Sequence, residues 1–437
     1  MTRDNSFASR LRKLVGPNVV PRLWGDGLQA AQDDPVSLSH TLLTARGQAS
    51  GVAIADQVLS LIEGLTGDGI DRYFTALRVE FEVDLDEVLA AAERARDEGP
   101  TALKALQLAA EPPRQELFRR LNAAPGGTAR LVEVRRKLLA ALRHDPTLAP
   151  IDADLRHLLR SWFNRGFLVP TRIDWHSSAD LLEKIIAYEA VHAIDTWDAL
   201  RERLVPTDRR CFAFFHPAMP NEPLIFVEVA LTKGLASSIQ SVLASPREVL
   251  NAEDADTAIF YSISNCQVGL AGISFGAFLI KQVASDLKAE LPNLKTFSTL
   301  SPVPGFAKWA AAQGIPTGTL TSGQDSLVPA AAAYLAEAKD DADRPFDPVA
   351  KFHLGNGAEL HRINPDADLS EKGLEQSHGV MVNYLYELDQ VEARHEAFAA
   401  SGELAVSRAV RTALGRPRPW GAARQTGVGA DVDQSDL

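Results

Sequence analysis

The sequence predicts an α+β protein in which an all-helical N-terminal part precedes a domain of mixed strands and helices. Up to about residue 165 the apolar residues recur at spacings of three and four, which is typical of amphipathic helices. After Gly166 short apolar runs alternate with turn residues, as in strands. We therefore expect a helical domain over residues 1–165, a mixed domain over 166–415 and a flexible tail over 416–437.

Length and charge narrow the classes of function. The chain has 437 residues, which at about 150 residues per domain corresponds to two or three domains. Its 45 Lys and Arg residues against 57 Asp and Glu residues give a net charge of −12, which argues against nucleic acid as a partner. The start lacks the apolar core of a secretory signal, and no apolar run is long enough to span a membrane. We expect a cytoplasmic protein, with the mitochondrial matrix less favoured.

Helices are predicted throughout the first part. Leu131, Val134, Leu138 and Leu142 form one apolar stripe, in a segment that ends near Asp145. Similar stripes predict helices over residues 85–96, 103–110, 114–121 and 155–163. The histidines of this part stand alone, and we assign no chemistry to it.

The second part begins with a predicted helix over residues 179–204 and two strands over 211–215 and 224–231. A short proline-rich connection joins the strands, which favours an antiparallel hairpin over a crossover helix.

A strand, a loop, a helix and a second strand follow over residues 258–263, 265–272, 275–291 and 296–300. Such a unit is a right-handed crossover between parallel strands. A glycine-containing loop that leads into a helix N-terminus suits an anion such as a pyrophosphate, although a plain tight turn has the same sequence signature.

Residues 272–276 (GISFG) also fit the G-x-S-x-G turn of α/β-hydrolases, with Ser274 as the nucleophile. Asp325 and His378 follow in the chain order that this class uses. A serine esterase or thioesterase is therefore an alternative function. Against it, the preceding chain predicts a hairpin and a helical domain rather than alternating strands and helices, and Ser274 also suits a helix N-cap.

Six segments between residues 205 and 390 resemble the malonyl-CoA decarboxylase family in sequence and in order. They are Phe214–Pro220 (FFHPAMP), Ile259–Ser264 (IFYSIS), Phe278–Lys281 (FLIK), Phe297–Phe306 (FSTLSPVPGF), Phe352–Ala358 (FHLGNGA) and Gly379–Tyr384 (GVMVNY). The resemblance implies a helical domain that supports oligomers, followed by a catalytic domain of the GNAT acetyltransferase fold. In that fold two splayed parallel strands admit the pantetheine arm of CoA.

The resemblance also implies roles for individual residues. Ser301 corresponds to the family's catalytic proton acceptor and His353 to its proton donor. The loop is implied to bind CoA through Gln267, Gly269, Ala271, Gly272, Ile273, Ser274, Phe275, Gly276 and Ala277. Some members carry glutamate at the position of Ser274, so that carboxylate is missing here. The expected partners are malonyl-CoA and acetyl-CoA, in a homodimer or homotetramer.

Decarboxylation of a malonyl thioester needs no organic cofactor or metal, because the thioester carbonyl accepts the electrons of the breaking bond. A hydroxyl and an imidazole suffice to stabilise the enolate and protonate it. A metal site is not expected, since His353, Glu359 and His361 lack the H-E-x-x-H spacing. The non-catalytic alternative is a protein that binds CoA without turnover.

The local sequence pattern predicts the structural position of both candidate catalytic residues. Ser301 ends the second strand of the crossover unit, just before Pro302, and its structural alternative is a turn serine. His353 precedes Gly355–Gly357 in a predicted hairpin, where its alternative is a surface histidine. Candidate supporting residues are His216, Asn356, Asn383 and Tyr384, and the segment over residues 322–349 has no assigned role.

Overall fold

The computed structural model describes residues 34–273, 276–316, 320 and 324–416, and these residues form two compact units. The first unit holds the described chain up to Phe167 together with two later segments, His216–Pro220 and Gln267–Ile273. The second unit holds the remainder. The predicted tail from residue 417 onward lies outside the described residues.

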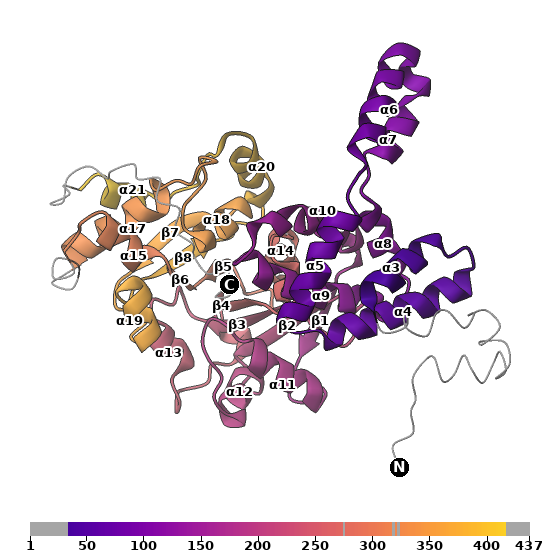
Figure 1. Ribbon diagram of the computed structural model, residues 1–437. Coiled ribbons are helices and arrows are strands. Elements are labelled where there is room, and N and C mark those ends of the chain that lie inside the picture. Colours follow the sequence, from indigo (N-terminus) through magenta and orange to yellow (C-terminus); the bar gives the residue numbers. More distant parts are fainter. Residues whose placement is uncertain (1–33, 274–275, 317–319, 321–323, 417–437) are drawn as a thin grey trace. The chain divides into compact units, whose positions relative to one another are not determined.

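The first unit is helical (Figure 1). Its α-helices are α3 (Pro35–Thr44), α4 (Gln48–Gly64), α5 (Asp68–Glu80), α6 (Leu85–Glu98), α7 (Leu103–Ala109), α8 (Pro113–Asn122), α9 (Gly127–Leu142) and α10 (Ala149–Trp162). Phe74, Leu117 and Leu155 are fully buried in its core, which is built from the apolar stripes of these helices. The four helices predicted over residues 85–163 and the helix that carries Leu131 are confirmed.

The second unit is built on an eight-stranded sheet of order β1-β2-β3-β4-β5-β8-β6, in which β7 also pairs with β8 (Figure 1). The strands are β1 (Val169–Ile173), β2 (Arg209–Phe215), β3 (Ile225–Thr232), β4 (Thr257–Asn265), β5 (Thr296–Thr299), β6 (Ser301–Pro302), β7 (Glu359–Asn364) and β8 (Met381–Leu385). The predicted hairpin is confirmed, because β2 and β3 pair antiparallel.

Helices complete the second unit. They are α11 (Ala179–Tyr188), α12 (Trp197–Leu204), α13 (Ile239–Leu243), α14 (Gly276–Glu290), α15 (Phe306–Ala312), α17 (Gln324–Ala336), α18 (Pro348–Gly355), α19 (Glu371–Ser377), α20 (Val391–Ser401) and α21 (Arg408–Leu414). Among the described helices of both units, none is both long and apolar enough to cross a bilayer.

The predicted crossover joins β4 to β5 through α14, and the two strands are parallel. Their pairing runs only from Thr257 with Thr296 to Phe260 with Thr299. Beyond this point β4 continues to Asn265 while β5 ends, so the strands separate. This is the splayed pair that the resemblance implies, and the α+β fold class is confirmed.

Two predicted elements are wrong. The helix expected over residues 179–204 is broken into α11 and α12, because the Glu189 carboxylate accepts the N–H groups of Val191 and His192 at 2.8 Å each. These contacts turn the chain out of the helix. The hairpin strand expected around His353 is helix α18. Asp347 caps its start by accepting the Ala350 N–H at 2.8 Å, and a proline occupies the first turn.

Candidate active site

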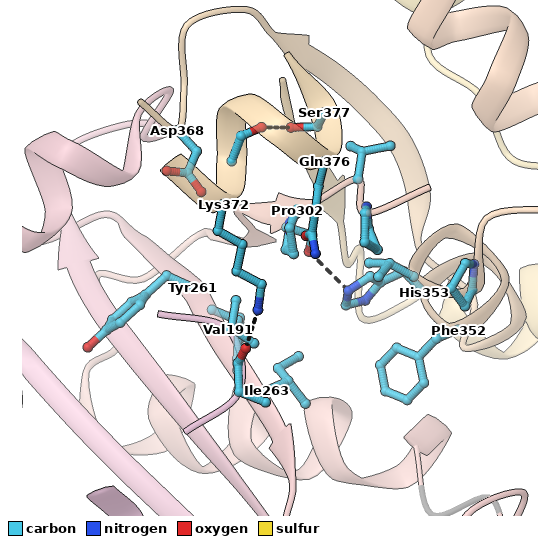
Figure 2. Close-up of a pocket in the computed structure, with 18 of the residues that line it drawn as sticks. Val191, Tyr261, Ile263, Pro302, Phe352, His353, Asp368, Lys372, Gln376 and Ser377 are labelled. Atoms are coloured by element: carbon cyan, nitrogen blue, oxygen red, sulfur yellow. Dashed lines mark hydrogen bonds between the residues drawn. The ribbon is translucent and has the colours of Figure 1, made fainter. Parts of the chain in front are cut away.

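A cavity of about 240 Å³ lies where β4 and β5 separate, within the second unit (Figure 2). Most of its wall is apolar and includes Phe260, Ile263, Val303, Val349 and Phe352. Its polar lining includes Ser301, His353, Asp368, Lys372 and Gln376. The combination of an apolar wall and a few convergent polar groups is typical of a small-molecule site.

Ser301 reaches the cavity because the strand pairing breaks immediately before it. β5 ends at Thr299, and Ser301 begins β6 by pairing with Val382 of β8. The Ser301 hydroxyl donates to Thr299 Oγ1 at 2.8 Å and lies 3.0 Å from Nε2 of His353. The two predicted catalytic side chains are therefore in direct contact.

The His353 ring is held on three sides. Its Nε2 atom contacts Ser301, and its Nδ1 atom lies 2.9 Å from the hydroxyl of Tyr386. The ring of Tyr384 stacks on the imidazole, with centroids 4.6 Å apart and an angle of 25° between the planes. The histidine side chain, only 3% exposed, has one orientation in which all three contacts are made.

Burial fixes the protonation state of His353. It lowers the pKa of the imidazole to about 3, so the ring is neutral at physiological pH. A neutral imidazole has one N–H. Because Ser301 already donates its hydrogen to Thr299, its oxygen accepts the Nε2–H of His353.

Tyr386 is the hydrogen-bond partner of the other ring nitrogen of His353, Nδ1. Burial raises the pKa of its phenol well above the usual value, so the hydroxyl is protonated and donates to Nδ1 of His353. The hydrogen bonds thus run in one direction, from Tyr386 through His353 and Ser301 to Thr299.

Lys372 lies across one side of the cavity. It extends from α19 toward the segment that carries Val191, and its Nζ atom donates to the Ala190 carbonyl at 2.8 Å (Figure 2). Because His353 is neutral, Lys372 is the single cation among the described residues that line this cavity. An ammonium group has three donors, so Lys372 can bind an anionic ligand while keeping this contact.

Buried ionic groups hold the part of the cavity wall that Ala190 and Val191 form. Glu228, which is fully buried, accepts from Arg203 Nη1 at 2.9 Å, and Arg203 Nη2 donates to the His192 carbonyl at 2.8 Å. Burial raises the pKa of Glu228 to about 7. Arg203 therefore ties this part of the cavity wall to β3.

The other predicted residues have different positions. Asn356 ends α18, and its N–H donates to the His353 carbonyl at 3.1 Å. Asn383 supports the strand instead of the imidazole, since its amide donates to the Thr299 carbonyl at 2.8 Å. His216 belongs to the first unit, where its ring packs against Phe163 with centroids 4.8 Å apart, and it is not among the residues that line the cavity.

The loop predicted to bind CoA divides between the two units. Gln267, Gly269, Ala271, Gly272 and Ile273 belong to the first unit, in which a 3-10 turn, η5, covers Val268–Leu270. Ser274 and Phe275 lie outside the described residues, and α14 begins with Gly276 and Ala277. The role of this loop stays a prediction.

The hydrolase alternative has no described geometry. Ser274 and the side chain of Asp325 lie outside the described part of the chain. His378 ends α19 with a φ of 52°, and its ring meets the edge of Phe306 with centroids 6.1 Å apart. Within the described ranges, no group of three or more His, Cys, Asp and Glu side chains is placed to hold a metal ion.

Tyr386 and Lys372 were not predicted from the sequence to belong to the site. The sequence does contain an indication for Tyr386, because it follows Tyr384 by two residues, and alternate residues of an extended chain share one face. Both tyrosines meet the same imidazole. The sequence contains no such indication for Lys372, since it is one lysine on a short polar helix.

Comparison with known proteins agrees with this geometry. The model of the malonyl-CoA decarboxylase N-terminal domain matches residues 81–163, and that of the C-terminal domain matches residues 166–326 and 317–422. The fold, the site and these matches define the chain as an enzyme of the carboxy-lyase class. It belongs to the malonyl-CoA decarboxylase family.

Three relatives show how far the similarity extends. A crystal structure of malonyl-CoA decarboxylase from Rhodopseudomonas palustris is 50% identical, with a TM-score of 0.82, over 87% of this chain and 99% of that one. The structure from Agrobacterium vitis is 47% identical, with a TM-score of 0.82, over 88% of this chain and 100% of that one. The mitochondrial enzyme of Anser anser anser is 35% identical over 375 residues, 74% of each chain. These relatives support neither the hydrolase nor the non-catalytic alternative.

Proposed function

We propose that the protein converts malonyl-CoA to acetyl-CoA and CO2 at the cavity between β4 and β5. The observation that carries the proposal is the ordered chain of hydrogen bonds from Tyr386 through His353 to Ser301, at the wall of a mostly apolar cavity. Family membership supports the identity of the substrate.

The first step breaks the bond between the carboxylate carbon and the α-carbon of the malonyl group. The electron pair of that bond moves into the thioester, whose oxygen becomes an enolate, and CO2 leaves. An apolar wall favours this step, because it stabilises neutral CO2 relative to the carboxylate. In this proposal the Ser301 hydroxyl turns its hydrogen from Thr299 to the developing negative charge, and the Nε2–H of His353 is the second donor.

The second step protonates the α-carbon. His353 gives its Nε2 proton, while Tyr386 passes its hydroxyl proton to Nδ1, so the ring stays neutral and changes tautomer. Solvent then returns one proton to Nε2, and Nδ1 gives its proton back to the tyrosine oxygen, which restores the starting tautomer. The pair of contacts explains how a histidine that is neutral at physiological pH acts as a proton donor. The scheme needs no organic cofactor or metal, because the thioester is itself the electron acceptor.

The test is mass spectrometry of the purified protein incubated with malonyl-CoA in D2O with a chelator. Deuterated acetyl-CoA that forms despite the chelator is the expected product. Free CoA with released malonate would indicate thioester hydrolysis and bring Ser274 forward. Tight binding of CoA without any product would indicate a non-catalytic CoA-binding protein.

The proposal includes a homodimer or homotetramer and a cytoplasmic location. Its support is the family resemblance of the helical part and the similarity to the two bacterial enzymes, which exceeds that to the mitochondrial one. Light scattering of the full chain would measure the mass of the assembly, and a monomer would contradict the proposal. Fractionation of the source cells would test the location.

A further inference from the structure

The segment over residues 322–349, for which the sequence indicates no role, contains a fully buried carboxylate, Asp347. Asp347 immediately precedes α18, the helix of eight residues that carries His353. Its Oδ1 atom accepts the Ala350 N–H at 2.8 Å and so caps the helix. A helix of about two turns is marginal by itself, so the cap helps to determine where the helix begins and where His353 lies.

Tyr334 of α17 connects the start of α18 with the chain that follows Ser301. The tyrosine ring contacts Phe346, just before α18, with centroids 6.3 Å apart, and Phe306, the first residue of α15, with centroids 5.8 Å apart. Its hydroxyl lies against the backbone of Gly305, where a Cβ atom would overlap the hydroxyl oxygen. One fully buried tyrosine therefore contacts the chain next to each of the two catalytic segments.

The Asp347 carboxylate interacts with the same tyrosine. Burial raises the pKa of Asp347 to about 6, although the Ala350 N–H, the Tyr334 hydroxyl and the Gly305 N–H each act to lower it. Burial and the charge of Asp347 raise the pKa of Tyr334 far above its usual value, so the phenol keeps its proton. The carboxylate is thus the point at which α17, α18 and the turn at Gly305 meet.

The segments next to this pair form part of the cavity wall. All residues of Ser301–Pro304, which precede Gly305, line the cavity, and so do four residues of α18, His353 among them (Figure 2). Ser301 Oγ and His353 Nε2 are 3.0 Å apart. A displacement of reacting groups by about 1 Å costs much of the rate, so the way in which α18 is held against the turn at Gly305 matters for catalysis.

Asp347 reaches His353 through the helix and not through its charge. The cause of the low pKa of His353 is burial. The contact that Asp347 makes with α18 is the one to the Ala350 N–H at the helix start. A neutral side chain that keeps this contact should therefore replace the carboxylate with little loss of activity.

We propose that Asp347 and Tyr334 are positioning residues, which hold α18 against the turn at Gly305 and thereby set the distance between His353 and Ser301. The inference rests on the proposed function, because it concerns the reaction that these two residues carry out. Neither Asp347 nor Tyr334 is among the described residues that line the cavity. Their loss should therefore lower kcat and leave KM unchanged.

The experiment compares Asp347→Ala and Asp347→Asn with Ser407→Ala in the full chain. Ser407 is a matched control, because this buried serine caps α21 of the same unit by accepting the Val410 N–H at 3.2 Å, and none of the described residues of α21 lines the cavity. We expect Asp347→Ala to lower kcat about tenfold with KM within about twofold. Asp347→Asn keeps an oxygen that caps the helix and should recover kcat to within about threefold of the wild type. Ser407→Ala should lower the melting temperature and leave both constants unchanged.

Tyr334→Phe is a second variant that keeps the test valid if Asp347→Ala does not fold. It removes the hydroxyl but keeps the ring between Phe306 and Phe346, so we expect kcat to fall about threefold. Because the two residues act as one unit, the double variant should lose less than the product of the two single losses.

Three outcomes would overturn the proposal. The first is an unchanged kcat in the folded Asp347→Ala and Tyr334→Phe variants. The second is a loss in Asp347→Asn as large as that in Asp347→Ala, because the cap would then not be the cause. The third is an equal fall of kcat in Ser407→Ala, which would show an effect of stability alone.

NMR of the His353 imidazole separates this inference from the function itself. With isotope-labelled histidine, the signals of His353 are those that disappear in His353→Asn, and they report which ring nitrogen carries the proton. In the wild type this nitrogen is Nε2. We expect Asp347→Ala to populate both tautomers and Asp347→Asn to keep the wild-type signals. If the wild-type protein shows no decarboxylation, the proposed function fails, whereas unchanged imidazole signals in Asp347→Ala would overturn the positioning role.

Discussion

The hydroxyl of Tyr386 lies 2.9 Å from Nδ1 of His353, while Ser301 contacts Nε2 of the same ring at 3.0 Å. The imidazole is thus in contact with a proton donor at one nitrogen and faces the substrate cavity with the other. This arrangement explains why burial, which removes the charge of His353, is compatible with proton transfer.

Loss of either member of the serine–histidine pair should abolish most of the activity. We expect His353→Asn and Ser301→Ala each to lower kcat by more than ~100-fold, as is usual when an acid–base or enolate-stabilising group is removed. Initial rates with malonyl-CoA provide the measurement. His361→Asn, on β7 of the same unit, is the control and should keep the wild-type rate. Wild-type rates in both site variants would disprove the site assignment.

The two tyrosines around His353 allow a matched comparison. Tyr386→Phe removes the hydroxyl that reaches Nδ1 and should lower kcat by about 10- to 100-fold. Tyr384→Phe removes a buried hydroxyl that has no hydrogen-bond partner among the described residues, and it keeps the stacked ring. We expect it to retain activity. Equal losses in the two variants would mean that both rings act through packing alone.

The neutral state of His353 has a consequence for stability against pH. The pKa is about 3 in the folded protein and 6.5 for an unburied histidine, so between these values the unfolded state binds more protons at this site. His353 therefore destabilises the fold progressively as pH falls from about 6.5 toward 3. Urea unfolding at pH 7 and pH 4.5 should show a smaller loss of stability in His353→Asn than in the wild type. An identical loss would contradict burial of a neutral ring.

The same state predicts how the rate depends on pH. His353 stays neutral from pH 5 to 8. The plot of kcat against pH should therefore show no inflection near pH 6.5 that is due to His353. Stopped-flow measurement of CO2 release over this range is suitable. A histidine-dependent inflection near neutrality would show that the substrate-bound ring is charged.

Lys372 should contribute to substrate binding through its charge. Substitution by Gln removes the one cation among the described lining residues, and we expect KM for malonyl-CoA to rise about 3- to 10-fold with a weaker dependence on salt. Lys308→Gln removes an exposed lysine from α15, outside the cavity lining, and should leave KM unchanged. A KM for Lys372→Gln equal to that of the wild type would exclude a binding role.

The sequence predicts what depends on local pattern. Helical stripes, the β2–β3 hairpin and the parallel β4–β5 pair follow from spacing and connection length, and the structure confirms them. Ser301 was predicted to end the second strand of the crossover unit, but β5 already ends at Thr299, and Ser301 and Pro302 form β6 by pairing with β8. The helix around His353 was missed although Asp347 and Pro348 are ordinary helix-start residues, because the glycines after His353 suggested a hairpin.

Contacts between segments that are far apart in the sequence could not be predicted from the local sequence pattern. Arg135 of α9 donates to the Gly269 carbonyl, 134 residues away in the chain, and a single arginine on a helix gives no indication of what it binds. The same holds for the contact of Tyr386 with His353, 33 residues apart. The pKa of His353 likewise depends on burial, which only the packed structure shows.

The spacing of residues along β8 and the residue after it sets the geometry of the site. Val382 pairs with Ser301, the Tyr384 N–H donates to Thr299 Oγ1, and Tyr384 and Tyr386 meet the imidazole. A shift of β8 by one residue would exchange the two faces of the strand and bring Asn383 and Leu385 to the histidine. Insertions are therefore far harder to accommodate in these five residues than in the loops around them, and the spacing along β8 limits how far the enzyme can diverge and still decarboxylate.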